Sequence, residues 1–111
     1  MSEPPLPTLQ NTQWTVTSPN GVAQTLTFGT GNTVSGSTGC NSFSGSVMQS
    51  GNALSFGPLA STRRACQEPR QSAERQFFDL LDRTRGANAT LQTLTLLGQQ
   101  GDVLAVLARA G

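Results

Sequence analysis

Apolar and polar residues alternate along most of the chain, and short turn sequences separate the alternating stretches. The alternation is clear at residues 13–17 and 23–28, and Leu54 and Phe56 lie two positions apart. Successive side chains of a strand point to opposite faces, so this alternation predicts strands that bury one face. Turn residues, such as the Pro-Asn-Gly of residues 19–21, lie between them. Several short strands at this spacing predict an antiparallel sheet or barrel.

The same pattern predicts about seven to eight short strands along the chain. They are expected at residues 13–17, 23–28, around 34, 42–48, around 54–56, 89–97 and 103–107. Thr and Gly are frequent and charged residues make up only 12% of the chain. Such a composition suits sheets and turns better than helices.

One segment has helical instead of strand spacing. Apolar residues at positions 73, 77, 80 and 81 would share one side of a helix, which predicts a single amphipathic helix over about residues 72–84. Ser72 is a suitable N-cap, and Arg83 and Arg85 suit the negative end of the helix dipole. The expected fold is α+β and mainly antiparallel β, a cracked barrel or strongly curved sheet with one helix packed on it.

The length of 111 residues allows one domain. We place it at residues 12–110, after a flexible, Pro-rich lead-in over residues 1–11. The first residues have neither the basic nor the apolar region of a signal peptide, and no apolar run approaches the roughly 18 residues of a membrane span. We therefore expect a mature domain whose export signal was removed, located in the periplasm, at the envelope or outside the cell. A cytoplasmic protein is the alternative.

Charge and residue types exclude several classes of function. A net charge of +1 gives no broad attraction to nucleic acid or anionic membranes. The chain has no His, which is the commonest general base and metal ligand. Glu74, Asp79 and Asp82 could hold a divalent ion, but we interpret them as a solvated helix face that pairs with Arg75 and Arg83. We expect no catalytic residue, no metal and no cofactor.

Two further features concern binding. Arg63, Arg64 and Arg70 lie close together in the sequence and could form a basic patch that binds a partner. Trp14 is the one Trp of the chain, and we expect it to anchor the core. The alternative role for Trp14 is the wall of a ligand pocket.

A set of residues spread over the chain resembles one known family. In chain order the set is Trp14, Gly39, Cys40, Asn41, Gly45, Thr62, Cys66, Phe77 and Leu81. These residues, together with their strand, turn and helix context, resemble the META domain family, also called HslJ-like after the bacterial heat-shock protein HslJ. The resemblance extends over residues 11–109, which is nearly the whole domain.

The resemblance implies a cracked barrel with a helix and a place in the cell envelope. Family members are often exported or lipid-anchored, some are linked to stress and drug tolerance, and no biochemical activity is established for them. It implies a non-catalytic domain that acts in stress-related binding or envelope maintenance, and we expect this domain to be a monomer. Its partner would be a protein or an apolar small molecule held in the barrel mouth. A purely structural accessory module and a thiol-redox protein are the alternatives.

Cys40 and Cys66 are the only two cysteines. Without His they cannot complete the four-ligand shell of a structural zinc ion, and a reactive Cys normally needs a base or a helix N-terminus beside it. A disulfide would close a loop of about 25 residues and stabilise the fold by roughly 3–4 kcal/mol. We favour the disulfide, which would imply an oxidising compartment. Two buried free thiols, and a redox or metal role, stay open as alternatives.

Overall fold

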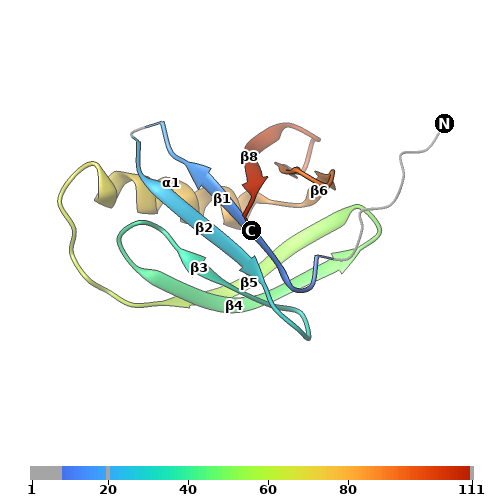
Figure 1. Ribbon diagram of the computed structural model, residues 1–111, viewed down its shortest axis with the longest axis horizontal. Helices are drawn as coiled ribbons and strands as arrows, with labels where there is room; N and C mark the ends of the chain where they lie inside the picture. Colours follow the sequence, from blue (N-terminus) through green and yellow to red (C-terminus); the bar gives the residue numbers. More distant parts are fainter. Residues whose placement is uncertain (1–8, 20, 111) are drawn as a thin grey trace.

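The computed structural model describes residues 9–19 and 21–110, and within them the chain forms eight strands and one helix (Figure 1). In chain order these elements are β1 (Thr12–Thr17), β2 (Ala23–Phe28), β3 (Thr33–Ser37), β4 (Ser42–Ser50), β5 (Ala53–Ser61), α1 (Arg70–Arg83), β6 (Gly86–Ala89), β7 (Thr93–Leu97) and β8 (Val103–Arg109). Within the described residues, no helix is both long and apolar enough to cross a membrane.

The strands form one antiparallel ring in sequence order, and β8 closes it by pairing with β1. The ring has two weak seams. The ladder between β1 and β8 has two residue pairs, Trp14 with Arg109 and Thr15 with Ala108, and the ladder between β5 and β6 has one, Ala53 with Gly86. The predicted cracked barrel is confirmed, and the cracks lie at these two seams.

The core contains the inward-facing residues of the alternating strands. Leu26 and Phe28 of β2 and Leu94 and Leu96 of β7 are buried, as the two-residue period predicts. Trp14 is 1% exposed. Its indole N–H donates to the Thr12 hydroxyl at 2.9 Å, and the Arg109 guanidinium lies 5.6 Å from its ring centre. The prediction that Trp14 anchors the core is confirmed.

The helix α1 packs against the barrel where its two seams open. In Figure 1, α1 lies behind β1 and β2, and the Gln24 side chain of β2 donates to the Ala73 carbonyl of α1 at 3.1 Å. Ala73, Phe77 and Leu81 are its buried residues. The ring of Phe77 meets the ring of Phe43 on β4 edge-on, with 5.8 Å between the centres.

The start of α1 differs from the prediction. The helix begins at Arg70 with Pro69 at the N-cap, and no side chain of the N-cap residue accepts a hydrogen bond. Ser72, predicted as the N-cap, lies inside the first turn. The carboxylate of Glu68 performs the capping instead: it accepts from the Ser72 N–H at 2.8 Å and from the Ser72 hydroxyl at 2.6 Å. The sequence favoured Ser72 because Ser is a common N-cap residue. It gives no local sign that the longer Glu68 side chain reaches past Pro69 to the first turn.

The strand boundaries also differ from the prediction: β4 ends at Ser50, β5 at Ser61 and β8 at Arg109, each beyond its predicted end. The predicted strand over residues 89–97 is two strands, β6 and β7, with a turn between them. The Thr90 hydroxyl accepts from the N–H groups of Gln92 and Thr93, which stabilises this turn. At the N-terminus, residues 1–8 of the predicted lead-in lie outside the described residues. Leu9, which we assigned to that lead-in, packs in the core.

Candidate functional site

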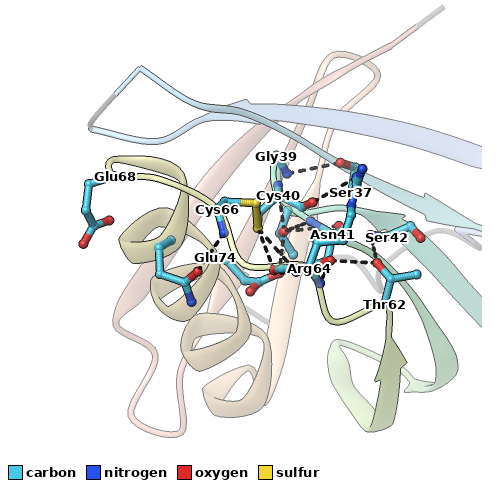
Figure 2. Close-up of a disulfide and its surroundings, with 12 residues drawn as sticks. Ser37, Gly39, Cys40, Asn41, Ser42, Thr62, Arg64, Cys66, Glu68 and Glu74 are labelled. Atoms are coloured by element: carbon cyan, nitrogen blue, oxygen red, sulfur yellow. Dashed lines mark hydrogen bonds between the residues drawn. A yellow bond between two sulfur atoms is a disulfide. The ribbon is translucent and has the colours of Figure 1, made fainter.

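A disulfide joins Cys40 and Cys66, whose Cα atoms are 6.0 Å apart (Figure 2). Cys40 lies in the turn between β3 and β4 and is buried, and Cys66 lies in the segment that leads from β5 to α1. The bond therefore fastens the start of the helix to one end of the barrel. The predicted disulfide is confirmed, and the alternative of two free thiols is wrong.

Asn41, beside the disulfide, connects three segments of the chain. Its side chain is 2% exposed. The Oδ1 atom accepts from the Thr62 hydroxyl at 2.9 Å and from the Arg64 main-chain N–H at 2.8 Å. The amide nitrogen donates to a Glu74 carboxylate oxygen at 2.9 Å and to the Arg64 carbonyl at 3.1 Å. Asn41 thus holds both the segment after β5 and the helix α1 to the β3–β4 turn, as Figure 2 shows.

Thr38 and Gly39 shape the turn that carries Cys40. The Thr38 hydroxyl accepts from the main-chain N–H groups of Cys40 and Asn41 at 3.1 and 2.9 Å, and it lies 2.9 Å from the same Glu74 oxygen that Asn41 contacts. Gly39 has φ of +91°, and a Cβ there would lie 2.3 Å from Val22. The turn therefore requires Gly at this position.

Glu74 has a different role from the one predicted for the carboxylates of the helix. Its carboxylate is half-buried and accepts hydrogen bonds in the Asn41 network, so it is not part of a solvated face. Asp79 does pair with Arg83, at 3.0 Å, whereas Arg75 pairs with Glu68 at 3.9 Å. Over residues 9–19 and 21–110, no three His, Cys, Asp or Glu side chains gather as a metal site would need.

Gly45 and Thr62 complete the residues that carried the family resemblance. Thr62 donates to Asn41 and accepts from the Ser42 N–H at 3.1 Å. A Cβ on Gly45 would lie 2.7 Å both from the Leu59 side chain and from the Pro58 carbonyl. Gly45 thus allows β5 to approach β4 closely at a bulge. These motif residues bond or pack against one another, which is the pattern of a structural centre.

The predicted basic patch is only partly assembled. Arg63, Arg64 and Arg70 are all exposed. Arg64 and Arg70 line a polar hollow of about 590 Å³ beside the disulfide, together with Glu68, and Arg63 lies outside it. Arg64 also donates from its guanidinium to the Cys40 carbonyl at 3.2 Å. Glu68 also lines this hollow and accepts from the Ser72 N–H at the N-terminus of α1, so its negative charge disfavours an anion there.

Two apolar grooves flank α1. The first, which we call the β5 groove, lies between α1 and β5 and has a volume of about 440 Å³; its lining residues are Phe56, Gly57, Pro58, Leu59, Phe78 and Asp82. The second, the β1–β8 groove, lies on the other side of α1 and has a volume of about 280 Å³; its apolar lining includes Val16, Phe77, Leu80, Leu104 and Val106.

The sequence analysis did not identify the residues of either groove. Leu59 lies three positions after Phe56, which breaks strict alternation, because a bulge at residues 57–58 places two residues opposite one on β4. Val106 belongs to a predicted strand, but only the divergence of β8 from β1 makes it the edge of a groove. The Gly57-Pro58 pair is the local signal for the bulge.

Comparison with known proteins gives a family and a fold. The sequence profile of the META domain matches residues 7–111. An NMR structure of a protein from Burkholderia xenovorans is similar, with a TM-score of 0.75 and 25% identity over 99% of this chain and 92% of that one. A second NMR structure has a TM-score of 0.63 and 24% identity over 91% of this chain and 89% of that one, and shares the fold. No curated protein matches this chain.

Proposed function

This chain belongs to the META domain family, and on that premise we propose that it is a non-catalytic binding domain of the cell envelope or of a secreted protein. The observation that carries the proposal is the closed polar network around Asn41. Its donors and acceptors bond to Thr62, Arg64 and Glu74, so the motif residues are occupied in holding the fold. Binding of an apolar small molecule would then use the β1–β8 groove beside α1. The stress-related role rests on family analogy.

The disulfide supports a location outside the cytoplasm. Disulfides persist in oxidising compartments and are rare where thiol reductants are abundant. The test is the intact mass of the protein isolated from its own cells with thiols blocked at lysis, before and after reduction. We expect Cys40 and Cys66 to take up alkylating reagent only after reduction. Alkylation of both residues without reduction would contradict the proposed location.

The β1–β8 groove supports binding of an apolar small molecule. Val16, Leu80 and Val106 form an apolar surface there, and the short β1–β8 ladder leaves the seam open beside it. The volume of about 280 Å³ lies just below the range of roughly 300–1,000 Å³ that is usual for ligand pockets. A compact molecule, or one end of a longer apolar chain, is the ligand of matching size.

Two exposed valines on β8 provide a matched test. Val106 lines the β1–β8 groove and Val103 does not, although both are exposed. We expect the apolar dye Nile red to bind at one saturable site, and Val106→Trp to weaken it about tenfold, or 1.4 kcal/mol. Val103→Trp adds the same ring outside the groove and should leave binding unchanged. Equal effects of the two variants, or no saturable binding, would contradict the proposal.

A thiol-redox function is the second candidate, and the partial exposure of Cys66 favours it. Thiol–disulfide exchange requires access to a sulfur atom. This function predicts that the folded protein exchanges with a small dithiol while its barrel stays intact. A disulfide that is reduced only after urea unfolds the protein would exclude it.

A purely structural module has no need for apolar grooves, so the two grooves beside α1 favour binding over that alternative.

A further inference from the structure

The strand β5 has an outer edge that no other strand covers over most of its length within the described residues. β4 pairs with β5 from Ala53 to Ser61, but β6 pairs with it only at Ala53. The last main-chain bond across this seam runs from the Leu54 N–H to the Arg85 carbonyl at 3.1 Å. Beyond it the neighbour is α1, which has no edge to pair with a strand.

The register shows which main-chain groups lie on that edge. The Val47 N–H donates to the Asn32 carbonyl, so the main-chain N–H and carbonyl of Val47 point toward β3. The main-chain groups of Phe56, its partner on β5, therefore point away from β4. By the same alternation, the main-chain groups of Leu59, which lies opposite Gly45 after the bulge, also point away from β4. The edge therefore presents the main-chain N–H and carbonyl groups of Phe56 before the bulge and of Leu59 after it.

The β5 groove lies directly against this edge. The side chain of Phe56 points into the barrel, where its ring centre lies 6.3 Å from that of Phe28. Phe78 of α1 forms the opposite wall, and its ring packs edge-on against Phe43 at 5.7 Å. A strand added to β5 would alternate its side chains, with one pointing into this groove and the next away from it.

Asp82 adds a negative charge to the lining of the groove. Its carboxylate has no ion-pair partner in the part of the chain that the structure describes, since Arg83 pairs with Asp79 and Arg85 donates to the Asp82 main-chain carbonyl. An apolar groove with one free carboxylate is complementary to an apolar side chain that has a cation next to it.

We propose that the β5 edge and the β5 groove bind an extended segment of a partner protein. The segment pairs with β5 as an added strand, places one apolar side chain between Leu59 and Phe78, and places a Lys or Arg against Asp82. The inference goes beyond the proposed function, because it concerns a different groove and a peptide instead of a small apolar molecule.

A second copy of this chain fits the site poorly. A symmetric pair would use the same edge on both copies. It would bring two Asp82 carboxylates to one interface, and Pro58 of each copy has no N–H to donate. The bulge and Pro58 interrupt this edge, so a symmetric pair would meet the interruption twice, once on each copy. A partner segment with a cation removes the charge repulsion, and it meets the bulge and Pro58 of one copy only.

The test uses the intact, disulfide-bonded protein and a random library of linear octapeptides. We expect selected peptides to share an apolar residue with Lys or Arg next to it or two positions away. An enriched peptide, followed by fluorescence anisotropy, should lose at least tenfold in affinity for Asp82→Arg. Asp102→Arg, a charge reversal at an exposed turn between β7 and β8, is the matched control and should bind normally. A peptide with Glu in place of the cation should recover affinity for Asp82→Arg.

Other results would overturn the inference. No enrichment, or equal binding by Asp82→Arg and wild type, would remove the site. Loss of peptide binding in Val106→Trp, with Asp82→Arg unaffected, would place the peptide in the β1–β8 groove. A dimer in sedimentation that Asp82→Arg changes and peptides do not would make a second copy the occupant. Nile red binding is measured separately, so failure of the peptide site leaves the proposed function standing, and the reverse also holds.

Discussion

Asn41 shows how one side chain can determine the arrangement of several segments. Its amide both donates and accepts, and its partners Thr62, Arg64 and Glu74 belong to two segments that follow it in the chain. Sequence reasoning marked Asn41 as a motif position, and it predicted the Cys40–Cys66 bond by excluding other chemistry. It could not predict the role of Asn41, because partners 21–33 residues away leave no local pattern.

At this scale we predict that Asn41→Asp destabilises the fold by about 2–4 kcal/mol. A carboxylate of the same shape cannot donate to Glu74, and it adds a buried negative charge beside the half-buried Glu74 carboxylate. Urea unfolding measures the loss. Asn88→Asp, at an exposed position, is the control and should change stability by no more than about 0.5 kcal/mol.

The double variant Asn41→Asp/Glu74→Gln tests the cause. Gln restores a donor opposite the new carboxylate, so the double variant should be more stable than Asn41→Asp alone. If both variants lose the same stability, the hydrogen bond to Glu74 is not the source of the effect.

At the scale of elements, α1 depends on a residue that precedes it. The predicted helix was correct in kind and nearly so in length, since the 3.6-residue period places Ala73, Phe77 and Leu81 on the buried face. Its first turn was not predicted correctly, because capping by Glu68 depends on how the chain passes Pro69. The hydrogen bonds that Ser72 donates, and to a smaller extent the charge of Arg75, lower the pKa of Glu68 below its ordinary value of 4.5.

This shift makes the stability of the fold depend on pH. A carboxylate whose pKa is lower in the folded state stabilises the fold above its unfolded pKa. That contribution is lost as pH falls through the lowered folded pKa. We predict that Glu68→Gln lowers the urea midpoint at pH 7 and that its difference from wild type disappears at pH values below the folded pKa. Asp102→Asn serves as the control for a carboxylate on an exposed turn; an unchanged Glu68→Gln difference at low pH would contradict the mechanism.

At the scale of the molecule, the barrel consists of a five-stranded part and a three-stranded part that meet at two short seams. Alternation predicted the strands and the ring, since each strand buries one face. It could not predict where the ladders stop, because that depends on the twist of the strands and on how α1 fits between them. The bulge at Gly57 and Pro58 is one place where the two-residue period fails, and the β5 groove lies there.

The disulfide is the one covalent link between distant parts of the barrel. We predict that Cys40→Ser/Cys66→Ser lowers the free energy of unfolding by about 3–4 kcal/mol, because the unfolded chain regains the freedom of a loop of about 25 residues. Urea unfolding of the double variant and of wild type, each with and without reductant, measures it. Reductant should bring the wild type close to the variant and leave the variant unchanged. An oxidised wild type no more stable than the variant would show that the bond adds no stability.

The same bond affects how the domain would respond to tension. β1 and β8 are adjacent, so a pull on the two ends of the chain would load their two residue pairs one after the other, and this seam would open at low force. The stretch from Cys40 to Cys66 contains the whole of β4 and β5, and the bond across 26 positions prevents it from lengthening. Under load the molecule would therefore extend at its two ends, while the hairpin with the β5 edge would be the last part to come apart.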